Sequence, residues 1–304
     1  MQPSVGVMLA TYNGEQFVRE QIESILRQQA VTTTLYARDD CSTDGTRAIL
    51  EHYALAYPKQ MVLLPDLSRR FGAACENFLS ILTDIYDTPH DYFAFSDQDD
   101  IWLPEKLSRA TKLIQSTNSF GYASNLTAFS NTSKEEWVIE KAYPQRRFDH
   151  LFQSASAGCT YVFDPIAAKL IATQIGKLDA LDWKGMSHDW LCYAICRSHG
   201  LSWVIDEWPG IRYRQHSQNQ FGAMPGFGGA MKRLSLMRSG WYREVLLKNQ
   251  RFLHQGNMEE KSILSRVSKF NIIDRLWLIA HVRQFRREPK AQLGLALALV
   301  MGLI

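Results

Sequence analysis

Residues 5–26 read VGVMLATYNGEQFVREQIESIL, in which an apolar run, a polar turn and an amphipathic stretch follow one another. The run Val5–Ala10 predicts a compact strand, and the polar turn begins at Thr11. Apolar residues recur at helical spacing across 15–29, which predicts a helix there. The opening of the chain is therefore typical of the strand, loop and helix unit of an α/β protein.

The same alternation continues downstream. Residues 32–37 (TTTLYA) predict a second strand, and residues 47–57 predict a helix that ends before a proline. Further strands are expected at 61–64 and 92–95, with a helix at 77–86 between them. Strands that alternate with helices indicate a mostly parallel sheet, whose ligands collect at the carboxyl ends of the strands.

Polar loops follow three of these predicted strands. Because the carboxyl ends of parallel strands lie along one edge of a sheet, we expect the three loops to converge on one crevice. The loops are Thr11-Tyr12-Asn13, Asp39-Asp40 and Asp97-Gln98-Asp99.

Charge is distributed unevenly along the 304 residues. From residue 230 onward there are 14 Lys and Arg against 5 Asp and Glu, which gives this part a net charge of +9. Because the whole chain has a net charge of +3, the rest of the chain has a net charge of −6. This split predicts an acidic catalytic part followed by a basic tail that faces an anionic surface or an acidic partner. Nucleic acid is not expected as a partner, because no aromatic and basic recognition motif is evident.

Targeting signals are sparse. The five cysteines are odd in number and lack CxxC spacing, which favours a reducing cytoplasm. The N-terminus does not resemble a signal peptide. Residues 291–304 are apolar, but as a helix they span about 21 Å, less than a bilayer core of roughly 30 Å. We expect a cytoplasmic protein whose tail either packs on the domain or lies on the cytoplasmic face of the inner membrane.

The segment FSDQDDIWLP at 95–104 crowds three carboxylates, Asp97, Asp99 and Asp100, directly after a predicted strand. Their mutual repulsion must be offset by a cation, a basic partner or solvent. A DxD at a strand end suits Mg²⁺ or Mn²⁺, which use one or two protein carboxylates and leave positions for phosphate. The alternative is a solvated acidic turn that caps the helix expected near Pro104.

Three segments, in this order and spacing, resemble the family 2 glycosyltransferases of the GT-A fold: MLATYNGEQFVREQIESIL (8–26), RDDCSTDGT (38–46) and FSDQDDIWLPEK (95–106). The resemblance is strongest to bacterial enzymes that build O-antigen and related polysaccharides, often rhamnosyltransferases, in which a later HDW and YRQH recur. It implies an α/β fold with a mixed, mostly parallel sheet flanked by helices and a C-terminal helical extension.

The resemblance extends to about residue 222. It implies a GT-A catalytic domain at 1–222, whose nucleotide-binding half is 1–100 and whose acceptor half is 101–222. A Gly-rich hinge at 222–230 would then lead into a basic helical extension at 223–304 that is a candidate for membrane association.

By the family pattern, Asp99 contacts the metal directly and Asp97 contacts the ribose or a metal-bound water. His216 follows a predicted strand and is a candidate third protein ligand, which suits Mn²⁺ better than Mg²⁺. Two arginines near it, Arg212 and Arg214, are either diphosphate partners or solvated.

Other loops are expected around the donor. Thr11, Tyr12 and Asn13 would cover the base and ribose, and Asp39 or Asp40 would accept a hydrogen bond from a pyrimidine imide, which favours UDP or dTDP. In the loop after these aspartates, Cys41 stands where the family usually has glycine.

The aspartate loop also has a competing interpretation, because Asp40, Ser42, Asp44, Gly45 and Glu51 match the ligand spacing of an EF-hand. An EF-hand needs an entering helix, whereas TTTLYA predicts a strand.

Two further segments are candidates with plain alternatives. Arg69 and Arg70 form a basic turn that reaches the nucleotide or lies on the surface. Gly158 and Cys159 belong to a small-residue loop that borders the donor sugar in the family, or is an ordinary loop before a strand.

The catalytic base is expected at HDW. Asp189 falls in the first turn of a predicted helix with Ser187 as a possible N-cap, where the helix dipole favours a carboxylate for capping reasons alone. The family's inverting mechanism requires one carboxylate beside the acceptor hydroxyl, which assigns that role to Asp189. His188 and Trp190 would shape the acceptor pocket.

These features predict an inverting, metal-dependent transferase. It would move rhamnose or another hexose from a dTDP- or UDP-sugar to a hydroxyl of a growing glycan, such as one linked to undecaprenyl diphosphate. The alternatives are a sugar-1-phosphate nucleotidyltransferase and a non-catalytic, membrane-associated subunit. The sequence does not determine the donor sugar, the acceptor or the linkage position.

Overall fold

The protein is described by a computed structural model that covers five stretches of the chain, namely residues 1–65, 70–130, 135–177, 185–216 and 238–304. Arg69, the expected hinge at 222–230 and the expected domain boundary after residue 222 lie outside the described residues.

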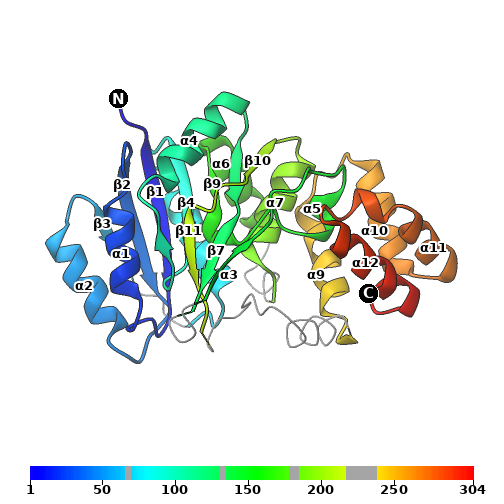
Figure 1. Ribbon diagram of the computed structural model, residues 1–304, viewed down its shortest axis with the longest axis horizontal. Helices are drawn as coiled ribbons and strands as arrows, with labels where there is room; N and C mark the ends of the chain where they lie inside the picture. Colours follow the sequence, from blue (N-terminus) through cyan, green and yellow to red (C-terminus); the bar gives the residue numbers. More distant parts are fainter. Residues whose placement is uncertain (66–69, 131–134, 178–184, 217–237) are drawn as a thin grey trace.

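A seven-stranded sheet forms the centre of the described residues, with strand order β10-β6-β9-β4-β1-β2-β3 (Figure 1). Neighbours in this sheet run parallel, except that β9 is antiparallel to both β4 and β6. The expectation of a mixed, mostly parallel sheet is confirmed. Its strands are β1 (Ser4–Thr11), β2 (Thr32–Asp39), β3 (Met61–Leu63), β4 (Tyr92–Ser96), β6 (Gly121–Ser124), β9 (Val162–Phe163) and β10 (Trp203–Asp206).

A smaller sheet lies beside the first and has the order β5-β11-β7-β8. It pairs β5 directly with β11, so the segment that follows the acidic cluster is joined to the strand that precedes His216. Two distant motifs of the sequence are brought together in this way. The strands are β5 (Ile101–Trp102), β7 (Leu126–Phe129), β8 (Glu136–Ile139) and β11 (Ile211–Arg214).

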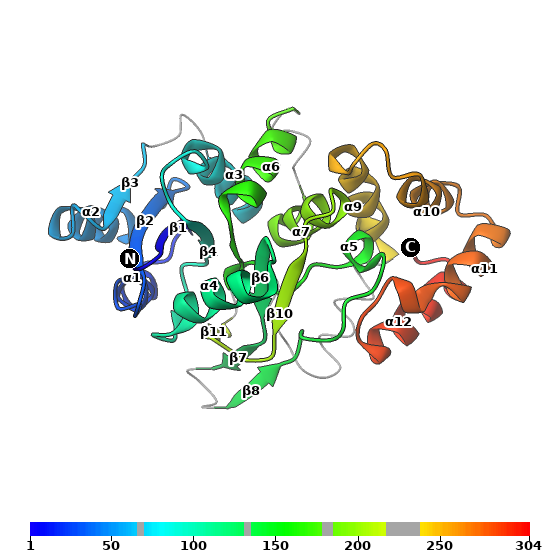
Figure 2. The same cartoon turned by 90° about the horizontal axis from the view of Figure 1, so that it is seen from above.

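Helices cover both faces of the large sheet (Figure 2). Val5, Val7 and Leu9 of β1 pack in a core with the first two helices and α4, whereas Met8 and Ala10 pack in a second core with α3, α6 and α7. Burial of both faces explains why the first strand reads as a continuous apolar run. These helices are α1 (Val18–Leu26), α2 (Thr46–Ala56), α3 (Ala74–Ile85), α4 (Lys106–Thr117), α6 (Pro165–Ile175) and α7 (His188–Ser198).

The C-terminal extension is helical, as expected, and packs against one end of the sheet domain (Figure 1). A third core joins it to α5 (Asp149–Phe152) and to α7 through Phe152, Trp190 and Ala194. No helix of the described stretches is both long and apolar enough to cross a membrane. The helices are α9 (Trp241–Asn249), α10 (Met258–Lys269), α11 (Ile272–Ala280) and α12 (Pro289–Met301), with short 3₁₀ turns at Gln250–Phe252 and Val282–Gln284.

The loop after β2 contains a residue with a left-handed backbone conformation. Cys41 is exposed and has a φ of 59°, in the left-handed region that favours glycine. Asp40 accepts hydrogen bonds from the backbone N–H groups of Phe71 and Gly72, and the element before it is a strand. The EF-hand interpretation is therefore wrong.

Candidate active site

The loops after β1, β2 and β4 converge on one pocket with a volume of about 560 Å³. Thr11, Tyr12, Asp40, Asp97 and Asp99 all line it, which confirms the expected convergence of the strand ends. The pocket extends from these loops across the start of α7 to the C-terminal extension. It is therefore shared by segments from almost the whole chain.

Gln98 ties two of these loops together. Its side-chain oxygen accepts a hydrogen bond from the backbone N–H of Tyr12 at 2.8 Å, and its side-chain nitrogen donates to the carbonyl of Tyr12 at 2.9 Å. A β-carbon on residue 14 would lie 2.3 Å from the Gln98 oxygen, so any other residue there would displace the Gln98 side chain. This link fixes the acidic loop relative to the loop after β1.

On the expected nucleotide side, Tyr12 and Arg70 form a platform. The Arg70 guanidinium lies 3.6 Å from the centre of the Tyr12 ring, and its Nε lies 3.9 Å from the Asp40 carboxylate. All three residues line the pocket. An aromatic ring beside a guanidinium suits a stacked base and a nearby anionic group.

Two of the expected nucleotide contacts do not line the pocket. Asp39 is buried and accepts hydrogen bonds from the hydroxyls of Thr11 at 2.9 Å and Ser42 at 2.6 Å. Asn13 accepts a hydrogen bond from the backbone N–H of Thr43 at 2.8 Å. These side chains hold the two loops in place, and Asp40 is the aspartate of its pair that lines the pocket.

The acidic corner, which contains Asp97, Asp99 and His216, combines oxygen and nitrogen donors. His216 Nε2 lies 2.7 Å from Asp99 Oδ2, although the two residues are far apart in the sequence. Asp97 is partly exposed at the pocket, and desolvation, with the Asp99 and Asp189 charges, raises the pKa of its carboxyl to about 7. A divalent cation held here would offset this repulsion, and two carboxylates with one imidazole are a suitable donor set for Mn²⁺.

Asp100 lies below this corner and is fully buried. Its Oδ1 accepts a hydrogen bond from the backbone N–H of Arg214 at 3.3 Å, its Oδ2 has no partner, and burial raises its pKa well above the usual range. Lys106 is also buried, with Nζ 3.4 Å above the Trp102 ring, and burial lowers its pKa to about 7. A solvated acidic turn is not consistent with this burial.

Cys159 lies next to these carboxylates but does not line the pocket. Ligand atoms of Asp97, Asp100 and Cys159 lie within 4.8 Å of one another. Burial and the neighbouring carboxylates raise the pKa of the Cys159 thiol well above its usual range, so the sulfur stays protonated. A thiol S–H beside two carboxyl groups supports their placement rather than ligating a hard cation.

Arg212 and Arg214 line a second, smaller pocket together with Glu20 and Glu136. Arg212 pairs with Glu136, and Arg214 pairs with Glu20 and donates to the carbonyl of Asp99 at 2.9 Å. The structure therefore gives Arg214 a role in shaping the acidic loop. Neither arginine lines the pocket that contains Asp97, Asp99 and Asp189.

The start of α7 presents Asp189 to the main pocket. Its Oδ1 accepts hydrogen bonds from the Ser187 hydroxyl and from the backbone N–H of Trp190 at 2.7 Å. Ser187 occupies the N-cap position, as expected, but its side chain makes no capping hydrogen bond. The helix start thus fixes one Asp189 oxygen and leaves the other for the pocket.

His188 and Trp190 flank the aspartate. The His188 ring lies 4.4 Å from Phe78 and 5.1 Å from Phe95 between ring centres, and burial lowers its pKa, which keeps it neutral. A β-carbon on residue 158 would lie 2.0 Å from His188 Nε2, so glycine at this position allows the close approach. Trp190 donates its indole N–H to the carbonyl of His150 at 2.9 Å, which fixes its ring.

Comparison with known proteins places this geometry in a family. A sequence profile described as "Glycosyl transferase family 2" matches residues 6–167, more than half of the chain. The chain belongs to glycosyl transferase family 2. It is therefore a glycosyltransferase.

Relatives of this glycosyltransferase agree with the assignment. The chain is 37% identical to "dTDP-rhamnosyl transferase RfbG" of Shigella flexneri, over 79% of this chain and 82% of that protein. It is 26% identical to an Escherichia coli protein described as "UDP-Glc:alpha-D-GlcNAc-diphosphoundecaprenol beta-1,3-glucosyltransferase WfgD", over 53% of this chain and 60% of that protein.

A solved structure confirms the GT-A fold. The crystal structure of S. aureus TarS 1-349 in complex with UDP-GlcNAc superposes with a TM-score of 0.59 at 15% identity, covering 99% of this chain and 80% of that one. The superposition extends over the C-terminal helices of the glycosyltransferase as well as its sheet.

Several pocket residues of the glycosyltransferase have no counterpart among the sequence-based predictions. Tyr213 adjoins the predicted motif that contains His216, which is a usable signal for it. The others come from segments with no recognisable motif, and the sequence offered no signal for them. They are Lys141, Tyr143, Trp241, Tyr242, Arg286 and Arg287.

Proposed function

We propose that this glycosyltransferase transfers rhamnose or a related hexose from a dTDP- or UDP-sugar to a hydroxyl of a polysaccharide precursor, with inversion at the anomeric carbon and with a divalent cation. The observation that carries the proposal is the position of Asp189. It lines the same pocket as Asp97 and Asp99, and its charge contributes to the raised pKa of Asp97. The similarity to a dTDP-rhamnosyl transferase supports the donor.

Asp97, Asp99 and His216 would hold the cation, Mn²⁺ or Mg²⁺. When bound, such a cation neutralises charge on a departing diphosphate. The pair of Asp99 and His216 at 2.7 Å supports this role, because a carboxylate and an imidazole from separate strand ends already meet there. Tyr12, Arg70 and Asp40 line the same pocket and would receive the nucleotide.

Asp189 would take the proton of the acceptor hydroxyl as its oxygen attacks the anomeric carbon. One bond forms from the acceptor oxygen to that carbon, and the bond from the carbon to the diphosphate oxygen breaks on the opposite face. The Ser187 hydroxyl and the Trp190 N–H, both directed at one Asp189 oxygen, fix the orientation of the carboxyl group. Neutral His188 packs beneath this position without competing for the proton.

The test is donor turnover by the purified protein. With Mn²⁺, dTDP-rhamnose is expected to be hydrolysed slowly in the absence of acceptor, and this hydrolysis is expected to stop when the cation is chelated. UDP-glucose, UDP-GlcNAc and GDP-mannose serve as comparison donors. Turnover that is indifferent to chelation, or a preference for the GDP-sugar, would contradict the proposed cation and nucleotide.

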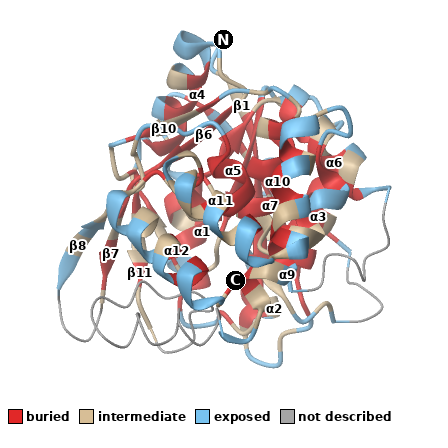
Figure 3. Cartoon of the chain, turned by 90° about the vertical axis from the view of Figure 1, so that its right-hand side faces the viewer, coloured by how far each residue is buried: buried red, intermediate tan, exposed pale blue. Residues whose placement is uncertain are grey.

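We also propose that the extension rests on an anionic membrane surface. Seven large apolar side chains are exposed on α11 and α12, and they recur at spacings of three and four within each helix. Figure 3 shows exposed residues along both helices. Arg275 of α11 donates to the carbonyls of Leu299 and Val300 of α12, so the two apolar faces adjoin. The side chains are Ile272, Ile273, Leu276, Leu293, Leu297, Val300 and Met301.

Vesicle flotation tests the surface. The protein is expected to float with vesicles that contain phosphatidylglycerol and to remain unbound with phosphatidylcholine alone, because exposed Lys269, Arg283 and Lys290 add charge beside the apolar faces. The double variant Leu293→Ser, Leu297→Ser is expected to lose flotation while keeping donor hydrolysis. Replacing exposed Leu55 with Ser is the matched control, and an equal loss in both variants would count against the proposal.

A further inference from the structure

One wall of the pocket is made by segments in which the sequence shows no recognisable motif. The pocket that contains Asp189 is also lined by residues from three segments: one follows β8, one begins α9 and one precedes α12. They are Glu140, Lys141, Tyr143, Trp241, Tyr242, Arg286, Arg287 and Glu288. Most of this wall therefore belongs to the C-terminal extension. The expected acceptor half at 101–222 is incomplete without it.

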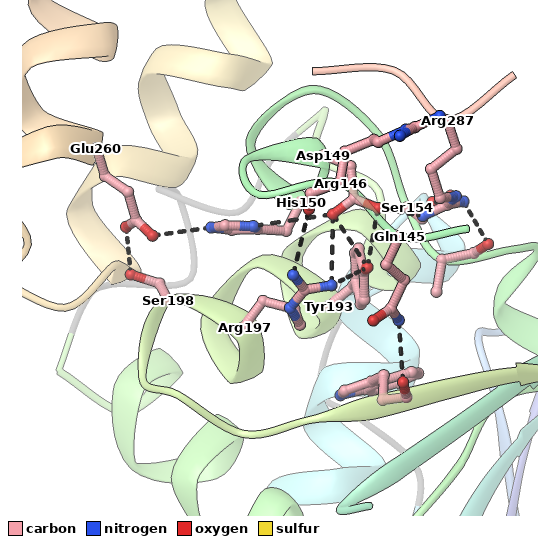
Figure 4. A network of polar contacts seen from close by, with 12 residues as sticks. Gln145, Arg146, Asp149, His150, Ser154, Tyr193, Arg197, Ser198, Glu260 and Arg287 are labelled. Atoms are coloured by element: carbon pink, nitrogen blue, oxygen red, sulfur yellow. Dashed lines mark hydrogen bonds and ion pairs between the residues drawn. The ribbon is translucent and has the colours of Figure 1, made fainter. Parts of the chain in front are cut away.

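A buried ion pair attaches this wall to the sheet domain (Figure 4). Arg287 is only 4% exposed and donates to Asp149 at 3.0 Å and to the carbonyls of Ser154 and Ala155 at 2.8 and 2.6 Å. Its charge is matched by Asp149 and its position is fixed. Because Arg286 precedes it directly, the backbone of Arg286 is held at the pocket.

A second contact fixes the extension from the other side (Figure 4). Glu260 of α10 lies 2.9 Å from His150 Nε2 and accepts a hydrogen bond from the Ser198 hydroxyl at the end of α7. All three residues are buried. The extension thus contacts both α5 and α7, the helix that begins with Asp189, so the wall and the candidate base belong to one packed unit.

Two positively charged side chains on this wall, Lys141 and Arg286, form no ion pair with a carboxylate of the described residues. Arg286 donates to the Tyr242 hydroxyl at 3.0 Å and to the Gln153 side-chain oxygen at 3.4 Å, both of which are neutral, and its Nε is buried without a partner. Among the described residues, no carboxylate lies within 4.0 Å of Lys141 or Arg286, and Glu288 on the same wall pairs with neither.

The cations also act on one another. Burial lowers the pKa of the Lys141 ammonium, and the Arg287 and Arg286 charges lower it further, although Glu288 and Asp189 oppose this. Two like charges that face the same space repel, and an anion bound between them would remove the repulsion. Lys141 and Arg286 line the same pocket as Asp189, so both cations lie on the side of the candidate base.

Aromatic rings adjoin the two cations. Tyr242 stacks on Trp190 with ring centres 5.4 Å apart, and its hydroxyl donates to the carbonyl of Phe152 at 2.5 Å. Trp241 donates its indole N–H to the carbonyl of Gly185 at 3.2 Å. Fixed aromatic side chains beside charged donors suit a ligand that is a sugar with an anionic substituent.

We propose that Lys141 and Arg286 form an anion subsite for the acceptor, and that the acceptor is a saccharide bearing a phosphate or carboxylate next to the sugar that is extended. The inference rests on the proposed function, because Asp189 marks the acceptor side. Either the diphosphate of a lipid carrier or the carboxylate of an acidic sugar supplies such an anion.

The experiment measures acceptor binding by titration calorimetry, with the donor side filled by dTDP and Mn²⁺. Three probes are compared: a short-chain alkyl diphosphate N-acetylglucosamine, an octyl glucuronide and the neutral octyl N-acetylglucosaminide. For wild-type protein, at least one charged probe is expected to bind at least tenfold more tightly than the neutral one. Which of the two does so identifies the source of the anion.

Variants test the residues. Arg286→Gln and Lys141→Met are each expected to weaken binding of the preferred charged probe at least tenfold, with less than a twofold change in binding of the neutral probe. Arg286→Lys is expected to recover part of the loss. Exposed Arg283→Gln is the control for total charge.

The outcomes separate this inference from the proposed function. Wild-type donor hydrolysis with no difference among the three probes would overturn the anion subsite and leave the transferase intact. Absence of any donor hydrolysis would overturn the proposed function. Equal weakening of charged and neutral probes in Arg286→Gln and Lys141→Met would show that these side chains support the fold, and would also overturn the subsite.

Discussion

The donor side and the acceptor side of the pocket are built in different ways. The donor side consists of loops that each follow a strand of one sheet, so Thr11, Asp40 and Asp99 lie near one another because parallel strands end at one edge. The acceptor side is assembled from segments at 140–143, 186–190, 241–242 and 286–288, which only tertiary packing brings together.

This difference teaches where sequence motifs can be expected. A loop of two or three residues at a strand end does its chemistry within a short window, so its pattern is readable. A wall made of single residues from separate helices leaves no such pattern. The tests that follow try to break or sharpen this contrast, from the largest expected effect to the smallest.

Replacement of Asp99 with Ala is expected to be the most damaging change on the donor side. It leaves His216 without its carboxylate partner, so the cation and the diphosphate are no longer held. A loss of at least about 10³-fold in transfer is expected, since metal stabilisation contributes several kcal/mol. Calorimetry with dTDP and Mn²⁺ should show no cation-dependent binding, whereas exposed Asp87→Ala should bind normally.

Asp189→Asn is expected to slow transfer greatly without affecting binding of the nucleotide. The amide keeps the shape of the side chain but accepts no proton, so transfer should fall by about 10²- to 10⁴-fold while dTDP and Mn²⁺ still bind with wild-type affinity. Single-turnover transfer and nucleotide calorimetry measure the two properties. Unchanged transfer in this variant would remove Asp189 from the mechanism.

Arg287→Gln is expected to weaken the attachment of the acceptor wall. It leaves Asp149 buried, with Arg197 and the Tyr193 hydroxyl still beside it, and it removes the bonds to two carbonyls. The free energy of unfolding should fall by about 3 kcal/mol. Urea denaturation measures this, with Arg283→Gln as the exposed control, and a loss no larger than the control's would mean that the wall does not depend on this pair.

Lys106→Met is expected to give the smallest effect and a pH signature. The pKa of buried Lys106 is lowered to about 7, so between that value and the unfolded value near 10.4 the unfolded chain binds the extra proton. Wild-type stability relative to the variant should therefore rise with pH by up to about 1.4 kcal/mol per unit from pH 7 to 9. Urea titrations at each pH test this.

Lys112 provides the comparison for that experiment. It lies on the same helix but is exposed. Lys112→Met is expected to change stability equally at every pH in this range. A parallel response of the two variants would show that burial of Lys106 does not set the pH dependence.

The first hundred residues were well predicted from sequence. Strands were expected at 5–10, 32–37, 61–64 and 92–95, and each was found within about two residues. Their apolar runs are short, are bounded by turn residues and alternate with helical periodicity, so local signals are strong there. Helix ends were less accurate, as at α1, which begins at Val18 rather than near residue 15.

Within the candidate site, residue type was easier to predict than position. Asp39 and Asp40 are adjacent in the sequence and both buried, but Asp39 bonds to the hydroxyls of Thr11 and Ser42, whereas Asp40 lines the pocket. The charge and position of Arg214 in the sequence suited a diphosphate partner, yet its side chain pairs with Glu20. The direction of a side chain depends on the neighbouring strand, which a local pattern does not specify.

The sequence by itself determined the α/β fold, the family and the acidic loops, because strand periodicity and short loop motifs are local properties of the chain. Only the tertiary structure decided that His216 meets Asp99, that Asp39 bonds to Thr11 and does not line the pocket, and that Arg286 and Lys141 line one pocket. The contact of His216 with Asp99 depends on the pairing of β5 with β11, whereas packing of the C-terminal helices on α5 and α7 brings Arg286 to the pocket. Long-range packing depends on the whole core, so no single segment encodes it.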